Sequence, residues 1–179
     1  MEEKALEFAR EAHGKQQRKY SNELYIEHPK RVAELVRSVS HTTEMICAAY
    51  LHDVVEDTPV SINEIYEKFG AEVGGLVAEL TDEFMKSNYP HLNRKTRKQK
   101  EVERQAGMSS NAKTIKLADV IDNTLNIVKN DTGFGRKYIR EMESLVRVLQ
   151  EGEAILLQRA LQEIKLGKQL LGYESKKGN

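Results

Sequence analysis

The stretch Glu44-Met-Ile-Cys-Ala-Ala-Tyr-Leu-His-Asp-Val-Val-Glu-Asp57 indicates how this chain folds. Its first two turns are apolar on nearly every side, and such a helix belongs in the middle of a bundle. It ends in four ionisable side chains, His52, Asp53, Glu56 and Asp57. Because residues three and four apart share one helix face, these groups are expected within one turn of each other. Acidic groups at a helix C-terminus are unfavourable without a cation, so the stretch indicates a divalent metal.

The rest of the chain is predicted to be helical as well. Apolar residues recur at helical spacing, as in Ala5, Phe8, Ala9 and Ala12. Period-two alternation is confined to Tyr20 to Ile26, where at most one short hairpin is expected. We therefore predict an all-α domain, a bundle of about eight to nine helices joined by short loops.

Some helix boundaries can be predicted from capping signals. Pro29 suits the first position of a helix running to Val39, with His28 as its N-cap. Ser61 and Glu64 have the spacing of a capping box at the start of another helix, which is expected to end at Gly70.

Length and composition favour one soluble domain. The chain has 179 residues, with 28 Lys and Arg against 28 Asp and Glu, so no overall field draws it to nucleic acid or to an anionic membrane. Cys47 is the only cysteine, and the longest apolar run, Met45 to Leu51, is far shorter than the roughly 20 residues of a spanning helix. We expect a cytoplasmic protein with one domain over residues 1–172, a frayed tail over 173–179, and no nucleic-acid or membrane partner.

Two other regions can supply metal ligands. One is His28, and the other is a predicted helix over Ala112 to Val128, whose polar stripe consists of Asp119, Asp122, Asn123 and Asn126. Taken alone, this stripe could equally be a solvated helix face. Two His and two Asp would form a mixed nitrogen and oxygen set that suits Mn²⁺, Fe²⁺ or Zn²⁺.

Together, His28, His52-Asp53 and Asp119 resemble the signature of the HD phosphohydrolase superfamily. The stretch His52-Asp-Val-Val-Glu-Asp57 resembles the hydrolase domain of the RelA/SpoT family. Further stretches match in order: Gln16-Gln-Arg-Lys19, Tyr25-Ile-Glu-His-Pro29, Phe69-Gly70, and Lys116-Leu-Ala-Asp119 with Asn123. The match spans nearly the whole chain and leaves no residues for synthetase or regulatory domains. The chain is therefore similar to the small, hydrolase-only members of the family, such as the metazoan SpoT homologue.

This resemblance implies an HD-domain helical bundle and Mn²⁺-dependent removal of the 3′-pyrophosphate from (p)ppGpp, which gives GDP or GTP and pyrophosphate. The implied metal ligands are His28, His52, Asp53 and Asp119, and the implied catalytic pair is Glu56 and Asp57. The residues implied in binding the nucleotide are Arg18, Lys19, Arg94, Asn123 and Tyr138. The family usually has a basic residue after Asp119, where this chain has Val120, and an aromatic residue or His where it has Asp122.

Two other functions stay open at this point. The same machinery could act on (pp)pApp or on the 2′-phosphate of NADPH. Alternatively, the chain could be a catalytically silent module that binds a nucleotide. The presence of both Glu56 and Asp57 argues against a silent module, because a binder needs neither. The oligomeric state is left open.

Overall fold

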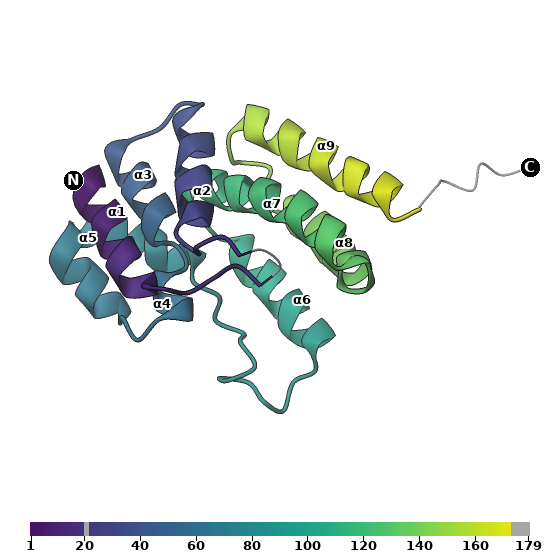
Figure 1. Cartoon of the computed structure of the whole chain (residues 1–179), viewed down its shortest axis with the longest axis horizontal. Coiled ribbons are helices and arrows are strands. Elements are labelled where there is room, and N and C mark those ends of the chain that lie inside the picture. The colour runs from purple at the N-terminus through teal and green to yellow at the C-terminus, as the bar shows by residue number, and fades with distance from the viewer. Residues whose placement is uncertain (20–21, 173–179) are drawn as a thin grey trace, which may run out of the picture.

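Helix α3 (Thr43–Leu51) lies in the interior of the molecule (Figure 1). Every residue from Met45 to Leu51 is buried, and the helix packs against α1 (Glu2–His13), α2 (Glu27–Arg37) and α5 (Ile62–Leu80). The prediction of a central apolar helix is thus confirmed. The hydroxyl of Thr42 caps its first turn by accepting the N–H of Met45 at 3.3 Å.

The computed structural model describes residues 1–19 and 22–172. Across these residues the chain forms nine helices and no strand, as predicted for an all-α domain. The remaining helices are α4 (Val54–Asp57), α6 (Arg94–Gln105), α7 (Ser110–Asn130), α8 (Thr132–Val146) and α9 (Ala154–Leu170). An antiparallel bridge joins Gln17 to Leu24. Residues 20 and 21 of the expected hairpin, and the tail over 173–179, lie outside the described residues.

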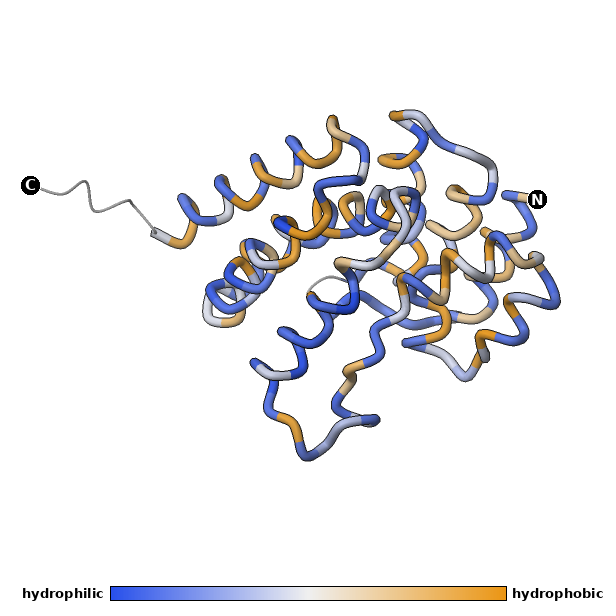
Figure 2. Tube along the Cα trace, turned by 180° about the vertical axis from the view of Figure 1, so that it is seen from behind, coloured by the Kyte–Doolittle hydropathy of each residue, from blue (hydrophilic) through white to orange (hydrophobic). Residues whose placement is uncertain are grey.

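Helix α7 lies between two groups of helices and packs against both (Figure 1). It packs against α2, α3 and α5 on one side and against α8 and α9 on the other. Apolar residues follow the inner sides of these helices, whereas α6 is hydrophilic along most of its length (Figure 2). Helix α6 packs on α8 and follows the loop over residues 81–93.

The predicted helix over Glu44 to Asp57 is interrupted at His52 and Asp53, so the single-helix prediction was wrong. Nδ1–H of His52 donates to the carbonyl of Ala49 at 2.8 Å. In a continuous helix that carbonyl would accept the N–H of Asp53. The side chain takes the place of a backbone donor there, and the one-turn helix α4 begins at Val54.

Two other boundaries differ from the prediction. Helix α2 begins at Glu27, so His28 lies inside its first turn and is not its N-cap. Pro29 is tolerated there because the first N–H groups of a helix have no partner within the helix. Gly70 has φ 88° and ψ 175° and interrupts α5 as a kink, but the helix resumes and continues to Leu80. The hydroxyl of Ser61 accepts the N–H of Glu64, which confirms the cap of α5.

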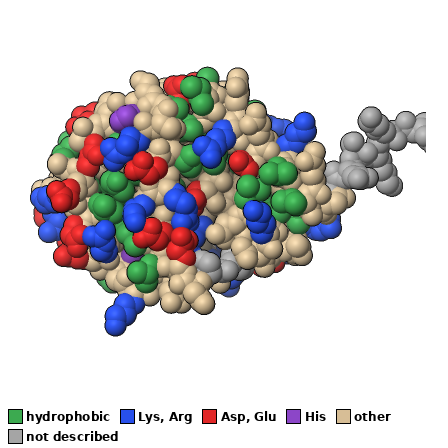
Figure 3. Space-filling model, turned by 45° about the horizontal axis from the view of Figure 1, so that its top comes forward, with side chains coloured by type: hydrophobic (Ala, Val, Ile, Leu, Met, Phe, Trp, Pro, Cys, Tyr) green, Lys and Arg blue, Asp and Glu red, His purple; other side chains and the backbone are tan. Residues whose placement is uncertain are grey.

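Acidic and basic side chains are interspersed over the face in Figure 3, in keeping with the balanced composition. No helix in the described part of the chain combines the length and the apolar character needed to cross a bilayer.

Candidate metal centre and active site

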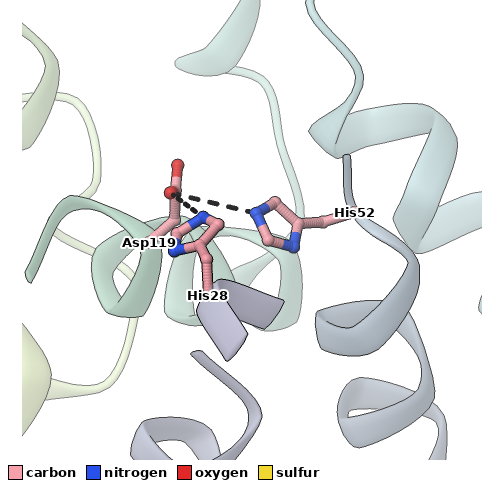
Figure 4. A group of neighbouring side chains, drawn as sticks. All are labelled: His28, His52 and Asp119. Atoms are coloured by element: carbon pink, nitrogen blue, oxygen red, sulfur yellow. Dashed lines mark ion pairs between the residues drawn. The ribbon is translucent and has the colours of Figure 1, made fainter. Parts of the chain in front are cut away.

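Four side chains from three parts of the fold meet at the inner end of α2. His28 comes from α2, His52 and Asp53 from the break between α3 and α4, and Asp119 from the middle of α7. Nε2 of His28 lies 3.3 Å from Oδ1 of Asp119 and 3.4 Å from Oδ2 of Asp53. Nε2 of His52 lies 3.1 Å from the same Asp53 oxygen and 3.9 Å from Asp119 Oδ1. The structure therefore brings together all four residues proposed as ligands. Figure 4 shows three of them, His28, His52 and Asp119.

Each of the two imidazoles is fixed through its Nδ1. Nδ1–H of His52 donates to a backbone carbonyl, and Nδ1–H of His28 donates to Oδ2 of Asp122 at 2.7 Å. Both Nε2 atoms are buried and lack a hydrogen-bond partner among the described residues. Because buried polar atoms are normally satisfied, two such nitrogens beside two carboxylates fit a divalent metal.

The charges of the side chains in this cluster also fit a divalent cation. Burial disfavours a charged His28, yet Asp119, Asp122 and Asp53 together raise its pKa to about 10. Burial would raise the pKa of Asp53, but His52 and His28 lower it well below its usual range. The buried carboxylates thus require positive charge at the Nε2 atoms, and a divalent cation supplies it in place of the protons.

Glu56 and Asp57 lie side by side on α4 in different surroundings. Oε1 of Glu56 accepts the N–H of Asp82 at 2.6 Å. Burial, followed by the charge of Asp82, raises the pKa of Glu56 to about 7. The Asp57 residue is exposed at the end of the turn, but partial burial of its carboxyl and the charge of Asp53 raise its pKa as well. Near neutral pH, Glu56 is therefore poised to gain or lose a proton.

Lys116 is a site residue that the sequence reasoning missed. Its Nζ lies 2.9 Å from Oδ2 of Asp119, one turn further along α7. Burial would lower the pKa of Lys116, but the charges of Asp119, Asp82 and Glu56 raise it well above its usual value. The signal was present in the sequence, because a Lys three residues before an Asp shares its helix face.

Arg18 and Asn123 are linked to the metal centre. Nη2 of Arg18 donates to Oδ1 of Asn123 at 2.8 Å, and Nδ2 of Asn123 donates to Oδ1 of Asp119 at 2.5 Å. The hydroxyl of Tyr25 donates to Oδ2 of Asp53 at 2.7 Å, and the guanidinium of Arg18 lies over the Tyr25 ring.

Asp119 and Asn123 also line a cavity of about 820 Å³ between α6, α7 and α8, together with the buried Tyr138. Arg94 lines its outer part, where Nε and Nη2 both donate to the Glu141 carboxylate at 2.8 Å. Lys19 is not among the residues that line this cavity. Its Nζ lies 5.8 Å from the centre of the Phe134 ring, over which the guanidinium of Arg94 also lies.

Comparison with known proteins identifies the family of this chain. The HD domain family matches residues 5–145. The protein named guanosine-3′,5′-bis(diphosphate) 3′-pyrophosphohydrolase MESH1 of Drosophila melanogaster is 38% identical over 133 residues, which cover 72% of this chain and 71% of that protein. The protein of the same name from Mus musculus is 36% identical over 141 residues, covering 76% and 75%.

Solved structures show the same fold. A structure described as a metazoan ortholog of SpoT that hydrolyzes ppGpp and plays a role in starvation responses superimposes with a TM-score of 0.81. It is 29% identical and covers 92% of this chain and 94% of its own. The fold is also shared by lmo0812 from Listeria monocytogenes EGD-e, with a TM-score of 0.66 and 22% identity over 80% of this chain and 96% of that one. The chain therefore belongs to the HD-domain family and, within it, to the group of MESH1-like proteins.

Proposed function

We propose that this chain is a Mn²⁺-dependent hydrolase that removes the 3′-pyrophosphate from (p)ppGpp in the cytoplasm, and that residues 1–172 form its one hydrolase domain. The observation that carries the proposal is the pair of buried, unpartnered Nε2 atoms of His28 and His52, which face Asp53 and Asp119 beside a cavity lined with cations. The names of the related proteins give the reaction.

His28, His52, Asp53 and Asp119 would hold the metal. A divalent metal lowers the pKa of water that it binds and neutralises phosphoryl charge. The mixed nitrogen and oxygen set suits Mn²⁺. Lys116 stays beside Asp119 and offsets part of the negative charge that Asp119, Asp82 and Glu56 bring to the site.

Glu56 would take the proton from the attacking water. In the metal-free site its pKa is raised to about 7, and a general base works best when its pKa lies near the working pH. The N–H of Asp82 fixes one of its carboxylate oxygens. We assign Asp57, the exposed neighbour, to orienting water or substrate at the mouth of the site.

The cavity would hold the nucleotide. Its wall contains cations suited to phosphate groups: Arg94, Lys95, Lys98, Lys116, Lys137 and Arg140. Tyr138 and Asn123 lie next to Asp119, where the ribose would be placed, and Arg18 reaches the same point through Asn123. Lys19, near the Phe134 ring, is assigned to the outer part of the nucleotide.

In the proposed reaction, water attacks the phosphorus bonded to the ribose 3′ oxygen. The bond between that phosphorus and the 3′ oxygen breaks, and pyrophosphate leaves with the oxygen of the water. The 3′ oxygen takes up a proton and becomes a hydroxyl group. The 5′ phosphates take no part in the bond changes, so substrates with a 5′ diphosphate and a 5′ triphosphate should react about equally.

The test is to incubate the Mn²⁺-loaded protein with ppGpp, pppGpp, ppApp, NADPH and GTP, and to measure pyrophosphate and orthophosphate separately. We expect pyrophosphate from ppGpp and pppGpp and no product from GTP, which lacks a 3′ phosphate. Orthophosphate from NADPH alone would make the chain a 2′-phosphatase, and faster turnover of ppApp would change the base. Robust hydrolysis of GTP would show that the chain is a general nucleotidase. Absence of turnover with every substrate would show that it is a catalytically silent binding module.

The acidic pair can be tested with variants that keep its shape. Glu56→Gln and Asp57→Asn should each fold and bind Mn²⁺ but lose turnover, by about 10²- to 10⁴-fold for a general base. Glu67→Gln, an exposed change on α5, is the matched control. Near-normal kcat in both site variants would make the pair structural.

A further inference from the structure

The ring of His28 is held between two carboxylates that lie one turn apart on α7. On one side, Nε2 lies 3.3 Å from Oδ1 of Asp119. On the other side, Nδ1–H donates to Oδ2 of Asp122 at 2.7 Å. The two acidic residues of the α7 stripe therefore have different positions, since one faces the candidate metal centre and the other lies behind the imidazole.

Asp122 is in turn fixed by Arg31 of α2. Nε of Arg31 donates to Oδ1 of Asp122 at 2.6 Å, and Nη2 donates to Oδ2 at 3.2 Å. Nη1 of Arg31 also donates to Oε1 of Glu23 at 2.6 Å. The exposed fraction of the side chain is 1% for His28, 9% for Asp122, 39% for Arg31 and 34% for Glu23. A continuous series of charged groups thus runs from the surface to the buried imidazole.

We propose that Asp122 is a positioning residue that orients His28 for metal binding, with Arg31 fixing Asp122. A carboxylate acceptor at Nδ1 keeps the proton on that nitrogen, leaves Nε2 as the ligand atom and makes it more basic. His52 differs, because its Nδ1 donates to the backbone carbonyl of Ala49, which no substitution removes. Of the two imidazoles, only His28 is therefore oriented by a side chain.

This inference rests on the proposed function in one respect, since it requires a metal at Nε2 of His28. Loss of a group that orients a metal-bound imidazole weakens metal affinity by about 10- to 100-fold. Asp122→Ala should thus raise the Kd for Mn²⁺ by about that factor and keep one ion per chain. Asp122→Asn keeps an acceptor oxygen and should lose less.

The experiment is calorimetric titration of the metal-free full-length protein with Mn²⁺. It uses no substrate, so any effect through Arg18, whose Nη2 lies 3.8 Å from Oδ2 of Asp122, does not enter. Glu2→Gln is the matched control, because it breaks the ion pair between Arg37 of α2 and Glu2 without touching His28. Circular dichroism of each metal-free variant establishes that it is folded.

A second measurement separates orientation from general packing. In Asp122→Ala the Mn²⁺ concentration for half-maximal ppGpp hydrolysis should rise about 10- to 100-fold, and excess Mn²⁺ should restore kcat. If the wild-type protein binds Mn²⁺ and folded Asp122→Ala binds it within twofold as tightly, the positioning role is overturned while the proposed function stands. If kcat is not restored by excess metal, the role is likewise overturned. A wild-type protein that binds no Mn²⁺ overturns both proposals.

Discussion

Glu56 shows how one residue acquires a property that its type does not have. Its carboxyl group is largely removed from water and lies near the carboxylate of Asp82. Both effects disfavour the charged form and raise the pKa of Glu56 to about 7. The N–H of Asp82 and the charge of Lys116 act in the opposite direction and limit this increase. The residue is adjacent in sequence to Asp57, which is exposed. The two neighbouring carboxyls therefore differ in exposure, while burial and a nearby carboxylate raise the pKa of each.

This pKa makes the stability of the metal-free protein depend on pH. Between pH 4.5 and about 7 the folded state keeps the Glu56 proton that the unfolded state has lost. The free energy of unfolding should therefore fall as the pH rises through this window, by about 1–3 kcal/mol from this group. Glu56→Gln has no titratable carboxyl at this position, so its free energy of unfolding should fall less over the same pH range.

The measurement is urea unfolding of metal-free wild-type and Glu56→Gln protein at pH 5 and pH 7.5. The difference between the two proteins isolates the contribution of Glu56 together with that of the groups whose charges act on it, chiefly Asp82 and Lys116. Parallel changes in the two proteins would contradict the raised pKa.

At the scale of the element, α5 depends on a glycine at its kink. Gly70 has φ 88° and ψ 175°, a region of backbone conformation that is essentially confined to glycine. Gly70→Ala should lower the free energy of unfolding by about 1–3 kcal/mol. Gly75 lies in the same helix, and a Cβ added there would meet no other atom within 4 Å. Gly75→Ala should therefore raise the free energy of unfolding by about 0.5–1 kcal/mol. Chemical denaturation of both variants gives the sign, and equal effects would show that the conformation of Gly70 is not strained for alanine.

Helix α6 fixes the segment that contacts Glu56. The buried carboxylate of Glu101 accepts the N–H groups of Glu83 and Phe84 at 3.0 and 2.9 Å and Nε of Arg104 at 2.6 Å. Asp82, just before these residues, donates its N–H to Glu56 and accepts from Nζ of Lys98 at 2.7 Å. A helix that lies at the cavity thus also orders the partner of the proposed base.

Glu101→Gln should therefore lower kcat and leave the Kd for Mn²⁺ unchanged. In the variant, the NH2 group of the new amide would face N–H donors that in the wild-type protein bind the Glu101 carboxylate. Leaving such buried donors without an acceptor costs about 1–3 kcal/mol of stability. Glu103→Gln, an exposed change on the same helix, is the control. Steady-state kinetics and metal titration test the expectation, and normal turnover in folded Glu101→Gln would refute the coupling between α6 and Glu56.

At the scale of the whole molecule, the metal centre joins helices that are distant in the sequence. His28, His52 and Asp119 come from α2, the end of α3 and α7, and their ligand atoms lie within 4.8 Å of one another. A metal that binds only the folded arrangement stabilises it, by about 2.7 kcal/mol at a concentration one hundred times its Kd.

Thermal unfolding should therefore shift to higher temperature as Mn²⁺ is added and return when a chelator removes it. Asp119→Asn should lose this shift because it removes the charged ligand from α7. An equal shift in Asp119→Asn would place the stabilising ion elsewhere.

The sequence by itself determined the helical fold, the central position of the helix after Thr42 and the residues that could bind a metal. Each of these depends on local spacing: apolar residues around a helix, and His52 beside Asp53. The proposed roles of Glu56 and Asp57 came from the resemblance of their motif to a known family, because two adjacent carboxylates alone do not specify a reaction.

Only the tertiary structure decided how the side chains of the candidate site are oriented toward one another. The polar stripe of α7 offers both Asp119 and Asp122, and no spacing within α7 tells which of them lies on the Nε2 side of His28. The break at His52 depends on its ring reaching the carbonyl of Ala49, and the raised pKa of Glu56 depends on Asp82 of another segment. These features arise from contacts between segments far apart in the chain and from burial, and a pattern read along one helix contains neither.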